Sequence, residues 1–117
     1  MLFRTLKPQQ KFHINITAIA KILHIPRHLI LRLERWAYVI FIHRQDCEGQ
    51  FISYRRLQNW QNAVACKIQS CCDCEQLKKL WLAILQDLKK YHKQYSQAKK
   101  SFIRKVWIER RNIILSI

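Results

Sequence analysis

The sequence predicts a mainly α-helical fold that includes one β-hairpin and ends in a long helix. Apolar residues recur at steps of three and four along most of the chain, which is the spacing of helices with one buried face. Two short runs rich in β-branched and aromatic residues, 38–43 and 50–52, flank a polar stretch that contains the only glycine, Gly49. An apolar seam then runs from Leu77 to Phe102 without proline or glycine.

Two short helices are predicted near the start of the chain. Residues 1–11 show no clear period, and we expect them to form a flexible arm. A helix is expected from Ile16 to Leu23, with Asn15 in position to cap it. Pro26 is expected to begin a second helix, because its fixed φ angle and missing N–H are tolerated in a first turn. The inward side of that second helix is predicted to hold Leu29, Ile30, Leu33, Trp36 and Ala37.

A hairpin and a third helix are predicted to follow. The strands 38–43 and 50–52 are expected to pair across a loop of about five residues. Ser53 is placed to cap the third helix, and residues 69–73 are expected to connect it to the last one. The apolar positions of the third helix are Leu57, Trp60, Val64 and Ile68.

The last helix is expected to pair two copies of the chain. A helix of this length with one apolar side is not stable alone in water, and a second copy is the simplest cover. We therefore expect a homodimer whose dimerisation helix and C-terminal apolar segment occupy 74–117. The predicted dimer interface comprises Leu77, Trp81, Ile84, Leu88, Tyr91, Tyr95 and Phe102.

The charge of the chain points to an anionic partner. The 117 residues include 22 Lys and Arg against 7 Asp and Glu, a net charge of +15 that both halves of the chain share. Such a field attracts polyanions, of which nucleic acid is the commonest in cells, with an anionic membrane surface as the competing target. No apolar run is long enough to span a bilayer and no secretory signal is evident, so we expect a cytoplasmic, nucleoid-associated protein.

Two short helices joined by a tight turn and followed by a hairpin are typical of a winged helix-turn-helix domain, which we expect over 12–70. The second helix of such a domain fits the major groove of DNA. Arginine side chains at its start can pair with guanine edges, which favours Arg27 and Arg32 as base contacts. The predicted DNA-binding residues are Asn15, Thr17, Arg27, His28, Arg32, Arg35, Arg44, Gln45, Tyr54, Arg55 and Arg56.

The order of these elements resembles the MerR-type regulators. Ile16-Thr-Ala-Ile-Ala20 is similar to the family's opening I-x-x-L-A, and Leu23-His-Ile-Pro26 stands at its L-G-V-S turn. Glu34-Arg35 resembles the E-R of its T-I-R-Y-Y-E-R run, while the residues before it depart from that pattern. The resemblance implies a homodimeric transcription factor with an antiparallel pairing helix. Small regulators of this layout accompany CRISPR-associated transposons, and excisionases share the winged fold.

The predicted function is therefore sequence-specific binding of double-stranded DNA at a palindromic operator, as a repressor without an effector domain. An excisionase-like architectural protein and an RNA-binding protein are the alternatives. Binding to a membrane surface is expected less, because a partner helix explains the seam better. We expect no enzyme, because one glycine cannot build a phosphate loop and the carboxylates show no catalytic spacing.

Four cysteines crowd the connector, at positions 66, 71, 72 and 74, and Cys47 lies in the hairpin loop. Their spacing lacks the two C-x2-C pairs of typical zinc sites, so free thiols are expected, with no metal and no cofactor. A thiolate metal site or a redox switch is the alternative that the residues leave open.

Overall fold

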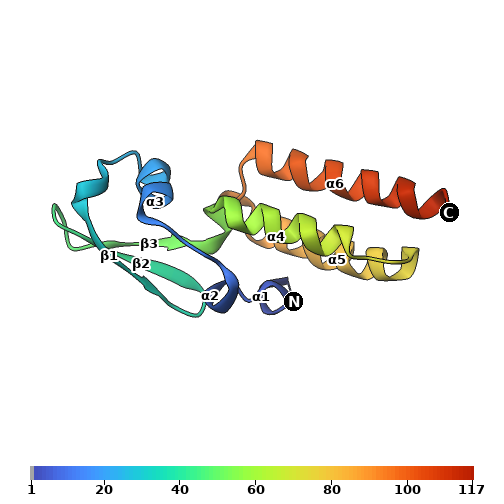
Figure 1. Ribbon diagram of the computed structural model, residues 1–117, viewed down its shortest axis with the longest axis horizontal. Coiled ribbons are helices and arrows are strands. Elements are labelled where there is room, and N and C mark those ends of the chain that lie inside the picture. The colour runs from blue at the N-terminus through green and yellow to red at the C-terminus, as the bar shows by residue number, and fades with distance from the viewer. Residues whose placement is uncertain (1) are drawn as a thin grey trace. The chain divides into compact units, whose positions relative to one another are not determined.

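The computed structural model describes residues 2–117 and divides into two compact units (Figure 1). One unit is Lys7–Trp60, and the other joins residues 2–6 to Gln61–Ile117. Most residues are helical, and three strands form one antiparallel sheet in the order β1-β2-β3. The predicted combination of a mainly helical chain with a hairpin is confirmed. The unit boundary falls inside a helix, near 60, rather than in the connector at 69–73.

The sheet lies in the unit Lys7–Trp60, together with short helices. The first helix of the predicted pair is confirmed, since α3 spans Ile16–Leu23 and the Asn15 side chain accepts a hydrogen bond from Ala18 N at 2.7 Å. The elements of this unit are α2 (Pro8–Lys11), α3, the 3₁₀ turn η1 (Arg27–Leu29), β1 (Ile30–Arg35), β2 (Val39–Arg44), β3 (Gln50–Ser53), the 3₁₀ turn η2 (Tyr54–Arg56) and the start of α4 (Gln58–Gln69).

The predicted second helix, after Pro26, is wrong. Helical geometry lasts only through η1, and the chain then extends as β1 along the edge of β2. Leu33 is paired with Ile42 and Arg35 with Ile40, and both isoleucines are fully buried. Strand pairing gives the backbone of β1 its hydrogen-bond partners, and such tertiary pairing overrides a local helical period. The structure therefore has one helix where a helix-turn-helix needs two.

The predicted hairpin is confirmed as β2 and β3, with Ile40 opposite Ile52 and Phe41 opposite Phe51. Gly49 has a φ of 111°, and a Cβ placed there would lie 2.8 Å from the carbonyl oxygen of Ile42. The loop therefore requires glycine at this position. Ser53 caps η2 by accepting a hydrogen bond from Arg55 N, and the third helix begins later than predicted, at Gln58.

The two faces of the sheet differ. Ile40, Ile42 and Ile52 point to one face and are buried, and Figure 1 shows α3 on that side. Successive side chains of a strand alternate between faces. Phe41 and Phe51 therefore belong to the opposite face, which no helix of the same unit covers.

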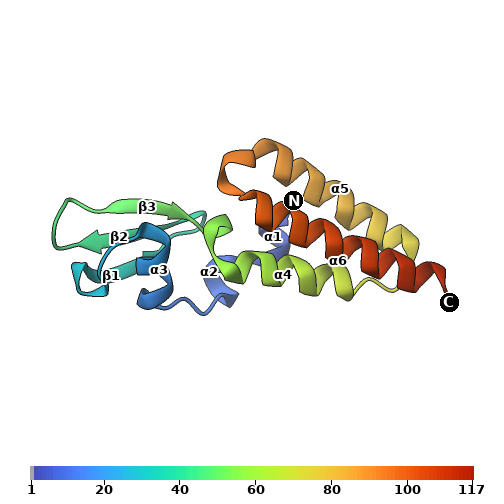
Figure 2. The same cartoon turned by 90° about the horizontal axis from the view of Figure 1, so that it is seen from above.

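The other unit is made of helices (Figure 2). Its elements are α1 (Leu2–Leu6), α4 from Gln61 on, α5 (Cys74–Lys90), the 3₁₀ turn η3 (His92–Gln94) and α6 (Gln97–Leu115). The predicted flexible arm is wrong for residues 2–11, because Leu2, Phe3 and Leu6 are buried and α1 packs on α5. Met1 of that arm lies outside the described residues.

The predicted single helix over the seam is also wrong, because α5 ends at Lys90 and α6 begins after the cap Ser96. The two helices pack on each other, and the rings of Trp81 and Trp107 stack with centroids 4.5 Å apart. Within the chain itself, Leu77, Ile84 and Tyr95 are buried. Part of the seam is therefore covered within the chain, while Trp81, Leu88, Tyr91 and Phe102 stay half-buried, which weakens the argument that predicted the dimer.

Among residues 2–117, no helix is both long enough and apolar enough to cross a bilayer.

Candidate nucleic-acid interface

The open face of the sheet presents a cluster of aromatic rings, which we call the aromatic face: Trp36, Phe41, Phe51 and His43. The ring centroids of Trp36 and Phe51 lie 4.9 Å apart, as do those of Phe41 and Phe51. His43 meets Phe41 edge to face at 4.7 Å. Trp36 and Phe51 remain 46% and 52% exposed. Large aromatic rings that stay half in water form a surface that a planar ligand can cover.

Hydrogen bonds hold the aromatic face in place. Phe41 and Phe51 are cross-strand partners, so their positions follow from the sheet register. The backbone of Trp36 is bound twice, because its N–H donates to the Val39 oxygen at 2.9 Å and its oxygen accepts from the Tyr54 hydroxyl at 2.7 Å. The Gln9 side chain donates to the Arg35 oxygen at 2.9 Å. The turn that presents Trp36 is therefore fixed from several sides.

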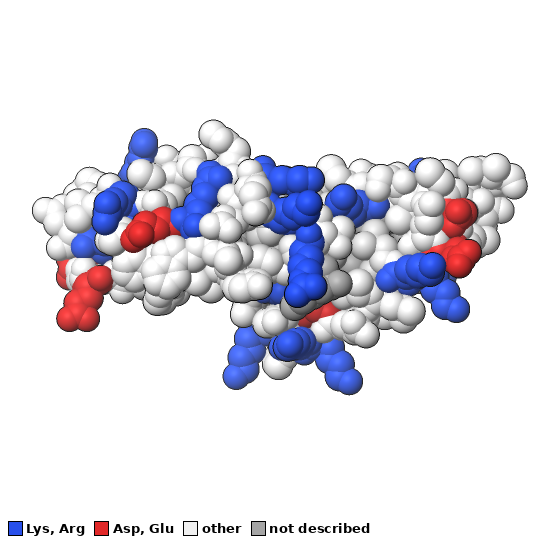
Figure 3. Space-filling model, turned by 90° about the horizontal axis from the view of Figure 1, so that it is seen from below, with Lys and Arg blue, Asp and Glu red and all other residues white. Residues whose placement is uncertain are grey.

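Charged groups border these rings. Arg32 lies opposite His43 in the register and is exposed. The ring of His43 donates a hydrogen bond to the Glu34 carboxylate, and this bond lowers the pKa of that carboxyl. Figure 3, which views the sheet from the side away from α3, shows an uncharged area on this unit with both Lys or Arg and Asp or Glu side chains at its edge.

A second group of predicted residues gathers at one end of the sheet. The backbone N–H of Gln45 donates to the Leu29 oxygen at 2.8 Å, so the hairpin loop lies against η1. Arg27, His28 and Gln45 are all exposed there. The structure thus brings together Arg27 and His28, which the sequence predicts on a helix, and Gln45, which it predicts in the hairpin loop. Thr17, Arg35 and Arg56 are exposed elsewhere on the unit, and the Asn15 side chain is occupied as a cap.

Three predicted DNA contacts are corrected by the structure. Tyr54 is fully buried and its pKa is raised by burial, while Arg55 is 5% exposed with its guanidinium 4.9 Å from the centroid of the Trp60 ring. Arg44 donates from Nε and Nη2 to Asp46 at 2.9 and 2.7 Å, which raises the pKa of Arg44 and lowers that of Asp46. Tyr54 and Arg55 are thus buried within the unit, and Arg44 is held by Asp46.

Sequence reasoning missed the rings of the aromatic face. The helical period predicts Trp36 on the buried side of a helix, and the structure has β1 and a turn there instead. The alternation in Val39-Ile-Phe-Ile-His43 was a usable signal, because it places Phe41 and His43 on one side and the isoleucines on the other. The position of Trp36 had no such signal, since it depends on the turn between β1 and β2.

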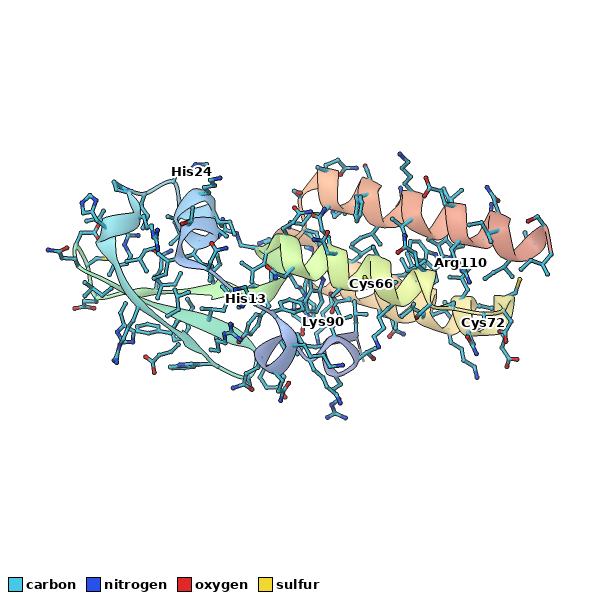
Figure 4. All side chains as sticks on the ribbon, in the orientation of Figure 1. His13, His24, Cys66, Cys72, Lys90 and Arg110 are labelled. Carbon is cyan, nitrogen blue, oxygen red and sulfur yellow. The ribbon has the colours of Figure 1, made fainter. Side chains whose placement is uncertain are left out.

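The cysteine cluster lies in the helical unit (Figure 4). Cys71 is buried, burial raises the pKa of its thiol, and its carbonyl oxygen accepts two hydrogen bonds from Arg110, at 2.9 and 2.7 Å. Cys66, Cys72 and Cys74 are exposed and unpaired with one another. Within residues 2–117, no three His, Cys, Asp or Glu side chains are placed to hold one metal ion.

Comparison with known proteins finds no family model, no curated protein and no solved structure that matches the chain.

Proposed function

We propose that this chain binds nucleic acid and that the aromatic face takes unpaired bases. The single observation that supports this most is the exposure of Trp36 and Phe51 on a sheet face whose backbone is held by hydrogen bonds. Proteins that bind single strands stack bases on aromatic side chains of this kind and track the backbone with cations. The net charge of +15 supplies the attraction to such a polyanion.

An exposed aromatic area is also typical of protein–protein contacts. The net charge favours nucleic acid over a protein partner. The chain has 22 Lys and Arg against 7 Asp and Glu, and this excess attracts a strongly anionic partner more than an average protein surface. Arg32 beside the rings suits a phosphate or a base face, since a guanidinium both pairs with phosphates and stacks.

The test measures fluorescence anisotropy of labelled single-stranded RNA, single-stranded DNA and duplex DNA against the chain and its variants. Trp36→Ala and Phe51→Ala are each expected to cost about 1–3 kcal/mol of single-strand affinity, the usual value of one stacked base. Leu82→Ala is the matched control, because Leu82 is an equally exposed apolar side chain in the other unit. Equal affinity of both ring variants and the control for every strand would contradict the proposal.

A second candidate is the duplex DNA-binding regulator predicted from the sequence. The observation that favours it is the exposed group of Arg27, His28 and Gln45 at one end of the sheet. Strands as well as helices can enter a groove, so the missing second helix does not by itself decide between the targets. In this case Arg27→Ala with His28→Ala should weaken duplex binding while Phe51→Ala should not. The regulatory role, the MerR-type assignment and the homodimer stay predictions.

A further inference from the structure

The helical unit contains a hollow of about 420 Å³ at the end of α5, beside α6. It is lined by Leu85, Leu88, Lys89, His92, Lys100 and Arg104. Leu85 and Leu88 form an apolar floor, and the other four lining side chains are basic. Leu85 is exposed and Leu88 half-buried.

The bend between α5 and α6 creates this arrangement. Lys100 and Arg104 are four residues apart, so they share one side of α6. Lys89 lies in the last turn of α5, and His92 Nδ1 lies 3.4 Å from the Lys89 oxygen in the bend. Residues from both helices therefore face the same space.

No carboxylate lines the hollow. Asp87, the nearest acidic residue along the chain, is buried and accepts a hydrogen bond from the Tyr95 hydroxyl. Within the described part of the chain, Lys89, Lys100 and Arg104 form no ion pair with a carboxylate. Like charges gathered around one space repel each other, and an anion placed between them relieves that repulsion.

We propose that this hollow binds a backbone phosphate of a nucleic-acid strand, with the sugar against Leu85 and Leu88. The inference rests on the proposed function and adds a second contact with the strand, in a different unit from the aromatic face. Lysine and arginine bind phosphate as a point charge and as a planar fork, respectively. The apolar floor suits a sugar attached to the phosphate better than it suits a free ion.

The test compares the salt dependence of single-strand binding in two double variants. Lys100→Gln/Arg104→Gln removes two charges from the hollow, and Lys78→Gln/Lys105→Gln removes two exposed charges of α5 and α6 outside it. For one lost phosphate, the slope of log Kobs against log salt concentration should fall by about 0.7 and the affinity at 0.1 M salt by about fivefold in the hollow variant only. Equal slopes and affinities in the two variants would overturn the inference.

The outcomes of these binding measurements distinguish a failure of this inference from a failure of the proposed function. If Phe51→Ala weakens binding and the hollow variant matches its control, the hollow assignment fails while the proposed function stands. If the unmodified chain binds no strand, both fail. If the hollow variant alone loses binding to vesicles that contain phosphatidylglycerol and keeps its strand affinity, the phosphate comes from lipid and the nucleic-acid assignment is overturned. Amide shifts at Leu85 and Lys100 on addition of a trinucleotide, absent with the hollow variant, would support the site directly.

Discussion

The hydroxyl of Tyr95 donates a hydrogen bond to the buried carboxylate of Asp87, eight residues earlier in the chain. In a continuous helix, residues this far apart are separated by about 12 Å along the axis and cannot be bonded. The bond is possible only because α5 ends at Lys90 and the chain bends before Ser96. The pair therefore ties the connection before α6 to α5, the two helices whose residues line the hollow.

Tyr95→Phe is expected to lower the free energy of unfolding by about 1–3 kcal/mol, because it removes one donor from a buried carboxylate. Urea denaturation of this variant, of Asp87→Asn and of the double variant forms a cycle that isolates the pair. A coupling energy indistinguishable from zero would show that the two side chains act independently.

Gly49→Ala is expected to destabilise the sheet unit by about 1–3 kcal/mol. The φ of 111° is strained for any residue with a Cβ, and the new atom would lie 2.8 Å from the Ile42 oxygen. Thermal unfolding followed by circular dichroism checks this, with Gln45→Ala as the control in the same exposed loop. A melting temperature equal to that of the control variant would contradict the backbone geometry.

Glu34 is expected to titrate below its usual pKa of 4.5, because His43 donates a hydrogen bond to its charged form. Because the pKa of Glu34 is lower in the folded state, the pair stabilises the fold at any pH above the unfolded-state pKa. This stabilisation is lost as the pH falls through the folded-state pKa. Carboxyl carbon shifts in a pH titration measure the midpoint. His43→Ala should return it toward the ordinary value, and no change would refute the pairing.

Cys71 is expected to react with a thiol reagent much more slowly than the other four cysteines. It is buried, and burial raises its pKa, so at neutral pH it has less thiolate than an exposed thiol has. Labelling with a disulfide reagent should show four fast thiols and one slow one, and all five should react quickly in guanidinium. Five equally fast thiols without denaturant would indicate that the connector is open.

Local chemistry was enough to predict part of this fold. Asn15 caps α3 because its side chain bonds a backbone N–H within the same turn, and Gly49 marks a loop that only glycine fits. The hairpin follows from two β-rich runs that a short loop separates. For the candidate site, Arg27, His28 and Arg32 are exposed as expected, although the second helix from which that exposure was predicted does not form. All these signals lie within a few residues of the feature that they predict.

The remaining features were decided by the tertiary structure. Ile30–Arg35 has a period that suits a helix, and it becomes a strand because the edge of β2 offers hydrogen-bond partners for its backbone. The seam Leu77–Phe102 suits one long helix, and it folds back because α6 covers α5 within the same chain. The aromatic face and the hollow arise from these two events. In the first event the partner strand begins four residues later, and in the second Trp81 meets Trp107 far along the chain, but in both the partner lies outside the segment, and no local period records which surface a segment will meet.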